Sequence, residues 1–93
     1  MAWKEMTLEE AAKNLGINVA EMREKQRLIQ QIVKARKKIG LSQSQLAKKI
    51  GVTQGRIAQI EAGIGTQRTS FDVLLHLLAV LGYEFKIVSR RAA

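Results

Sequence analysis

Gln54, Arg56 and Gln59 are the side chains of this sequence with the most specific binding chemistry. A glutamine amide can form two hydrogen bonds to the edge of an adenine, and an arginine can form two to a guanine. In a helix that turns about 100° per residue, Gly55, Ala58 and Gln59 point outward, with Gln54 and Arg56 on the flanks. Small residues let a helix backbone approach a surface closely. The pattern therefore predicts a helix face that contacts base edges in the major groove of DNA.

An ordinary helical hairpin with a weakly polar solvent face is the alternative. A solvent-exposed helix face usually carries glutamate and lysine, whereas this one carries glycine, alanine and glutamine. The composition of the face therefore favours DNA recognition.

Two short helices joined by a tight turn are needed to hold this face, and residues 42–63 predict them. Ser42 and Thr53 are suited to N-caps, and Gly51 lies where a left-handed residue can end the first helix. Ala47 lies where the helices would cross, and a larger side chain there would push them apart. The apolar anchors at helical spacing are Leu46, Ile50, Ile57 and Ile60. This combination is typical of a helix-turn-helix.

The chain has 93 residues and a net charge of +8. Its length favours one globular unit, which we divide into an N-terminal helical extension (1–25), a helix-turn-helix domain (26–82) and a C-terminal strand with a tail (83–93). Residues 1–25 hold four bases and five acids, whereas the remainder holds twelve bases and three acids. This basic field suits a phosphate backbone or an anionic membrane, although a basic soluble protein with neither partner is the alternative.

The composition argues against several classes of function. Cysteine is absent and His76 is the only histidine, so we expect no disulfide, no metal site and no cofactor. No apolar run approaches the roughly 18 to 20 residues of a membrane span, and no signal peptide pattern is present. Without a nucleophile–base pair or a phosphate-binding loop, we expect a cytoplasmic protein that is not an enzyme, associated with the nucleoid when bound to DNA.

Two further helices are predicted around the helix-turn-helix. A long helix begins after Asn18, runs to about Ile39 and is stopped by Gly40, with basic residues near its C-terminus. A second helix over residues 71–81 is apolar nearly all round. One of its sides can cover the core, and we expect a partner subunit to cover the other, which consists of Val73, Leu77 and Val80.

Residues 83–89 predict a β-strand, because Tyr83, Phe85 and Ile87 alternate. A single strand is not stable alone, so we expect two copies to pair antiparallel about a two-fold axis. Glu84 would then lie opposite Lys86 of the other copy. The alternative is that this strand adds to the sheet edge of a different protein.

The N-terminal extension contains a pseudo-repeat, because residues 7–22 are similar to residues 42–57. It could be a second DNA-contacting unit. The residues after Asn18 are acidic, however, and would face phosphates badly. This favours a short helix that folds back on the long one or reaches a partner.

Residues 41–43, 46–47, 51–52 and 57–61 resemble the Cro/Xre (phage-repressor-like) helix-turn-helix family, and the resemblance covers about residues 29–81. It implies an all-α domain of about five helices, here with one C-terminal strand, that binds palindromic operator DNA as a homodimer. It also implies an ion pair between Arg36 and Glu61. We predict base contacts by Gln54, Gly55, Arg56 and Gln59, and phosphate contacts by Gln43, Thr53, Thr66 and Arg68.

The sequence departs from the family pattern at two places. Gly55 is small where phage repressors often carry a base-contacting side chain, and Thr69 and Ser70 replace the usual proline before the last helix. Residues 81–88 and the N-terminal extension further resemble HigA-type antitoxins, which neutralise an RNA-cleaving toxin and repress their own operon. The expected function is therefore a repressor and antitoxin. The alternatives are a stand-alone Xre-type regulator and a protein-interaction adaptor built on a helix-turn-helix.

Overall fold

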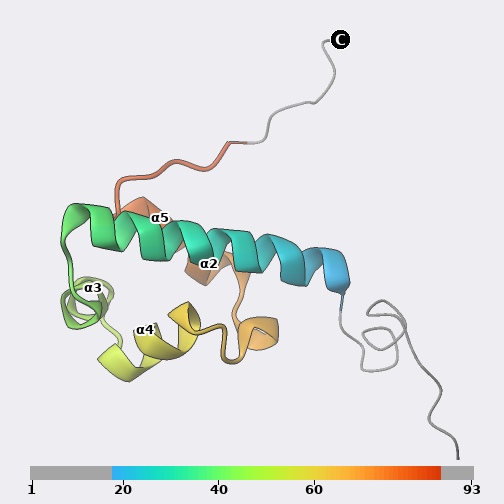
Figure 1. Ribbon diagram of the computed structural model, residues 1–93, viewed down its shortest axis with the longest axis horizontal. Coiled ribbons are helices and arrows are strands. Elements are labelled where there is room, and N and C mark those ends of the chain that lie inside the picture. The colour runs from blue at the N-terminus through green and yellow to red at the C-terminus, as the bar shows by residue number, and fades with distance from the viewer. Residues whose placement is uncertain (1–17, 87–93) are drawn as a thin grey trace, which may run out of the picture.

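The computed structural model describes residues 18–86, and the elements of this part are all helical (Figure 1). In chain order they are α2 (Val19–Ile39), α3 (Gln43–Ile50), α4 (Gln54–Glu61), the 3-10 turn η1 (Thr66–Arg68) and α5 (Phe71–Val80). The predicted all-α fold with a helix-turn-helix is thus confirmed. The short helix expected before Asn18 in the N-terminal extension and residues 87–89 of the expected strand, including Ile87, lie outside the described residues.

The long helix α2 has the predicted ends. The Asn18 side chain accepts a hydrogen bond of 3.0 Å from the Glu21 backbone N–H, which begins the helix. Gly40 ends it in the left-handed conformation, at φ 84°. The helix is continuous across residues 25 and 26, where we placed the end of the N-terminal extension, and that division of the chain stays a prediction.

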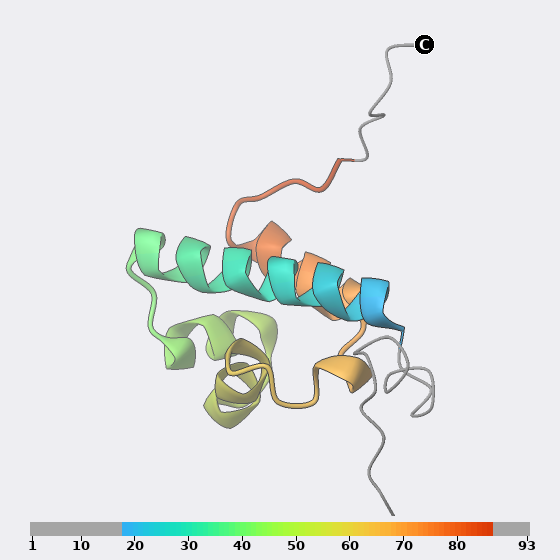
Figure 2. The same ribbon diagram turned by 45° about the vertical axis from the view of Figure 1, so that its right-hand side comes forward.

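The core lies between α2 and the other helices. α5 packs along α2, while α3 and α4 lie together on one side of this pair (Figure 2). Each helix supplies its apolar stripe. The buried apolar residues are Ile29, Ile32, Ala35, Leu46, Ala47, Ile57, Ile60, Leu74, Leu77, Leu78 and Leu81.

The expected second apolar side of α5 is smaller than the sequence suggested. Leu77 is 1% exposed and belongs to the core, so its assignment to a dimer surface was wrong. Val80 is half-buried and packs against the same core, while Val73 remains exposed. The physical reason is that α5 contacts both α2 and α3, which together cover more of its circumference than one helix could.

Residues 83–86 have neither helix nor sheet structure and run away from α5 as an uncoiled segment (Figure 1). Since a strand requires a paired neighbour, and no such neighbour is present among the described residues of this single chain, the expected strand is not formed here. Glu84 and Lys86 instead form an exposed ion pair of 3.8 Å within the chain. Phe85 is 61% exposed, so this segment presents apolar surface to its surroundings.

Candidate nucleic-acid interface

Caps at both ends hold the short helices of the helix-turn-helix. The Ser42 hydroxyl accepts from the Gln45 backbone N–H at 3.0 Å, and the Gln45 side chain accepts from the Ser42 backbone N–H at 2.8 Å. This reciprocal capping box, whose Gln45 half we did not predict, begins α3. The Thr53 hydroxyl accepts from the Arg56 backbone N–H at 3.1 Å and begins α4.

The turn between α3 and α4 depends on Gly51. This residue has φ 77° and ψ 32°, which glycine adopts without steric cost. A Cβ built on it would meet no atom within 4 Å, so the glycine is required by backbone conformation and not by lack of space. α3 and α4 then pack closely, with Ala47 only 2% exposed.

α4 presents the polar residues that the sequence predicted to contact bases. Gln54, Gly55 and Gln59 are exposed, while Arg56 is half-buried. A Cβ at Gly55 would meet only the Thr53 hydroxyl, at 4.0 Å. The surface of α4 at Gly55 is therefore open.

Below this surface, Arg36 and Glu61 form a paired contact between α2 and α4. Arg36 Nε donates to Glu61 Oε2 at 2.6 Å and Arg36 Nη2 donates to Glu61 Oε1 at 2.8 Å. The third guanidinium nitrogen, Nη1, donates to the Leu41 carbonyl at 2.8 Å. The two side chains are 11% and 7% exposed, so the pair is largely shielded from water.

The pair shifts the pKa of each group in the direction that favours its charged form. Burial by itself raises the pKa of the Glu61 carboxyl. Hydrogen bonds from Arg36 and Gln43, together with the charges of Arg36 and Lys37, outweigh burial and hold this pKa below its usual value. The hydrogen bond to Glu61 raises the pKa of Arg36, against the effect of burial.

A chain of hydrogen bonds connects this buried pair to the exposed start of α4. Gln43 Nε2 donates to Glu61 Oε1 at 3.1 Å, and Gln54 Nε2 donates to Gln43 Oε1 at 2.8 Å. The sequence did not indicate this link between Gln43 and Gln54. Because an amide group has two donor hydrogens and an acceptor oxygen, Gln54 keeps one N–H and its oxygen free for a ligand in this network.

The turn η1 follows α4 and carries the remaining predicted contacts. Arg68 is exposed there, whereas Thr66 is only 3% exposed and its hydroxyl donates to the Gly63 carbonyl at 2.9 Å. The prediction that Thr66 contacts phosphate was therefore wrong: its side chain closes the turn from inside. Thr53, the other predicted threonine contact, is exposed at the start of α4.

A comparison with known protein families agrees with this geometry. The model of the Helix-turn-helix family matches residues 32–88, which is more than half of the chain. The chain belongs to the helix-turn-helix family. A curated relative from Haemophilus influenzae (strain ATCC 51907 / DSM 11121 / KW20 / Rd), described as an uncharacterized HTH-type transcriptional regulator, is 41% identical over 64 residues. That match covers 69% of this chain and 63% of the relative, and no solved structure matches the chain.

Membership of the helix-turn-helix family supports DNA binding of the kind found in transcriptional regulators. Within residues 18–86, no group of three or more acidic or histidine side chains could hold a metal ion. In the same part of the chain, no helix is long and apolar enough to cross a membrane.

Proposed function

We propose that this helix-turn-helix protein is a sequence-specific transcriptional repressor that binds double-stranded operator DNA through α4. The observation that carries this proposal is the position of Gln54. It lies exposed at the N-terminus of α4 and is held by Gln43, which Glu61 orients in turn. A fixed amide next to the small residue Gly55 suits paired hydrogen bonds to an adenine edge in the major groove.

Phosphate contacts would surround the base contacts. Thr53 and Arg68 are exposed on either side of α4 in the chain, and Gln43 keeps one amide hydrogen that its two neighbours do not use. The net charge of +8 adds a general attraction for the DNA backbone. In this arrangement the base edges are contacted by Gln54, Gly55, Arg56 and Gln59. The protein would act in the cytoplasm, on the DNA of the nucleoid.

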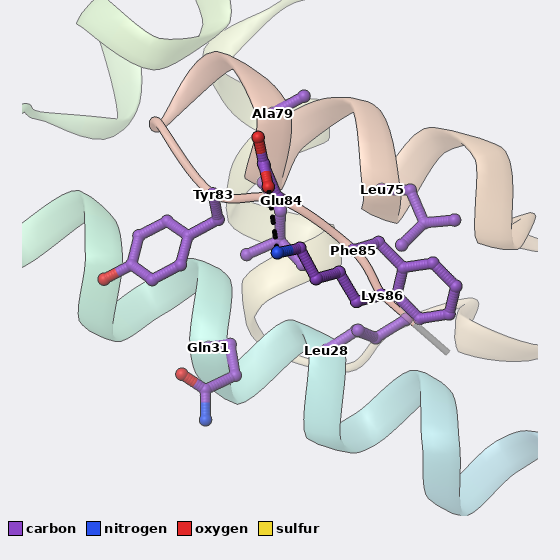
Figure 3. Close-up of a pocket in the computed structure, with 9 residues that line it drawn as sticks. Leu28, Gln31, Leu75, Ala79, Tyr83, Glu84, Phe85 and Lys86 are labelled. Atoms are coloured by element: carbon purple, nitrogen blue, oxygen red, sulfur yellow. Dashed lines mark ion pairs between the residues drawn. The ribbon is translucent and has the colours of Figure 1, made fainter. Parts of the chain in front are cut away.

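We further propose that the operator-binding form is a homodimer with a palindromic site. An apolar groove lies between α2 and α5, and Phe85 lies over Leu28 and Leu75 in it (Figure 3). The uncoiled segment that carries Phe85 leaves the helical core on the side of α2 away from α3 and α4 (Figure 1). A second copy placed against this side would leave α4 free for DNA. The partner contacts would come from Val73, Val80, Tyr83, Glu84, Phe85, Lys86 and Ile87.

The same segment supports a role as the antitoxin of a toxin–antitoxin pair. Tyr83 and Phe85 are exposed aromatic residues on a segment without helix or sheet structure, and such a segment can add as a strand to the sheet edge of another protein. A ribonuclease toxin bound there would replace the second copy at this segment, and it would not compete with DNA for α4. Co-expression with the protein of the neighbouring reading frame tests this role, since an antitoxin would relieve growth arrest and a stand-alone regulator would not.

Selection from a random pool of duplex DNA tests the repressor function. Wild-type protein should enrich a short palindromic sequence, and Gln54→Ala should lose the preference at one base pair of each half-site. If no sequence is enriched and binding does not depend on salt, the protein-interaction adaptor would be the better account.

A further inference from the structure

Lys25 is a buried charge in the first half of α2. It is 4% exposed, which is rare for lysine unless the ammonium group is paired. The ammonium nitrogen lies 3.4 Å from the Gln67 carbonyl oxygen, 3.5 Å from Glu21 Oε1 and 5.4 Å from the centroid of the Phe71 ring. Three groups from two distant parts of the chain therefore surround it.

The Gln67 carbonyl belongs to η1, the turn that carries Arg68. Two glycines in the left-handed conformation, Gly63 and Gly65, precede this turn and give its backbone many alternative conformations. The hydrogen bonds of Thr66 to Gly63 and of Thr69 to Gly65 are local and close the turn upon itself. The contact from Lys25 comes from another helix and fixes the turn relative to the body of the domain.

We propose that Lys25 is a positioning residue for the phosphate contact of Arg68. This inference rests on the proposed DNA-binding function. Holding the Gln67 carbonyl fixes the peptide group that joins Gln67 to Arg68, so the backbone from which the arginine extends is ordered before DNA arrives. A side chain presented from an ordered backbone loses less conformational freedom on binding and therefore binds more tightly.

A direct phosphate contact by Lys25 does not fit its surroundings. Its side chain is 5% exposed, and the ammonium group already faces a carbonyl oxygen, a carboxylate and an aromatic ring. The lysine is also better suited to this place than an apolar residue, because the Gln67 carbonyl accepts a hydrogen bond there.

The test is a double-mutant cycle between Lys25→Met and Arg68→Ala. Methionine keeps the apolar stem beside Phe71 and removes the charge and the hydrogen-bond donors. Binding to a mixed-sequence DNA duplex is measured by fluorescence anisotropy over a series of salt concentrations. We expect Lys25→Met to weaken binding about two- to tenfold in the wild-type background and to have little effect when Arg68 is already alanine.

Arg27→Met is the matched control. It removes one positive charge two residues along α2, from a side chain that is 75% exposed and paired with Glu24 at 3.2 Å. An equal loss for Arg27→Met and Lys25→Met would overturn the proposal, because net charge would then explain both. The proposal would also be overturned if Lys25→Met bound DNA with wild-type affinity. It would be overturned as well if Lys25→Met weakened DNA binding as much in the Arg68→Ala background as in the wild-type background.

Amide hydrogen exchange without DNA separates this inference from the proposed function. The Arg68 and Thr69 N–H groups both donate to the Gly65 carbonyl, and Lys25→Met should speed their exchange while α4 stays protected. Unchanged exchange of the Arg68 and Thr69 amides in Lys25→Met would overturn the anchoring role of Lys25. If the wild-type protein does not bind duplex DNA, the repressor function is overturned, and with it the role of Lys25 in a phosphate contact by Arg68. If Lys25→Met does not fold, Glu21→Gln takes its place in the double-mutant cycle. We expect this variant to lose less DNA affinity than Lys25→Met. Absence of coupling between Glu21→Gln and Arg68→Ala would count against the proposal.

Discussion

Glu61 joins α4 to α2 through two hydrogen bonds to Arg36, with 2.6 Å between Arg36 Nε and Glu61 Oε2 and 2.8 Å between Arg36 Nη2 and Glu61 Oε1. A planar guanidinium and a carboxylate match in this geometry, which fixes their mutual orientation as well as their distance. Because Gln43 donates to Glu61 and accepts from Gln54, the pair orients Gln54 at the start of α4 through Gln43. Stability and DNA binding are therefore expected to depend on the same contact.

The first prediction concerns the stability that this pair provides. Glu61→Gln keeps the shape of the side chain but leaves the Arg36 charge buried without its partner. We expect the free energy of unfolding to fall by about 3 kcal/mol. Urea denaturation measures this change, with Glu24→Gln as a control at an exposed ion pair. Equal stabilities of the Glu61→Gln variant and the wild type would show that the pair does not stabilise the fold.

The second prediction concerns how the free energy of unfolding changes at acidic pH. The folded-state pKa of Glu61 lies below its usual value, so the unfolded state takes up a proton first as the pH falls. The stabilising contribution of Glu61 should be complete above the unfolded-state value of about 4.3 and should be lost as the pH falls through the lower folded-state pKa. Unfolding free energies across this acid range should show a shallower slope for Glu61→Gln than for the wild type. Parallel curves would contradict the assignment.

The third prediction concerns the hydrogen bond between Gln43 and Gln54. Gln43→Ala would remove the proposed phosphate contact and would also release Gln54. It should therefore weaken binding to every sequence and relax the preference at the base pair proposed for Gln54. Competition between the selected operator and single-base variants measures both effects. A uniform loss across all variants would leave Gln43 as a phosphate contact alone, without a role in orienting Gln54.

The fourth prediction concerns Gln59, which is exposed on α4. Gln59→Ala should weaken specific binding by about 1–3 kcal/mol and relax the preference at one base pair. The matched control is Gln45→Ala, which changes a glutamine of the α3 capping box and leaves the face of α4 intact. Equal losses of Gln59→Ala on operator and random DNA would remove Gln59 from the base contacts.

The fifth prediction concerns the dimer. Truncation after Gly82 removes Tyr83 and Phe85 from the groove between α2 and α5, and should give a folded monomer with weak operator binding. Phe85→Lys is the matched point variant, because it removes the aromatic surface and keeps the chain length. Sedimentation velocity at micromolar concentration decides the outcome. A truncated protein that is still a dimer would show that the helices hold the subunits together.

The sequence was sufficient for features that depend on neighbouring residues. The caps at Asn18, Ser42 and Thr53, and the left-handed glycines at positions 40 and 51, are local, since each requires only a few residues of chain to act. The apolar spacing in α3 and α4 likewise predicted which sides of these helices are buried. The resemblance to repressors brought Arg36 and Glu61 to attention, and the structure places them in contact.

Tertiary structure decided the features that depend on residues distant in the chain. Leu77 and Thr66 were predicted as contact residues because their types allow it, but the helices packed over α5 and the closure of η1 bury both of them. Neither the burial of Lys25 nor the link from Gln43 to Gln54 has a local signal, because each depends on how two separate segments approach one another. Local patterns thus determined where the helices begin and end and which of their sides are apolar. The packing of those helices decided which polar side chains contact each other and which remain exposed for a ligand.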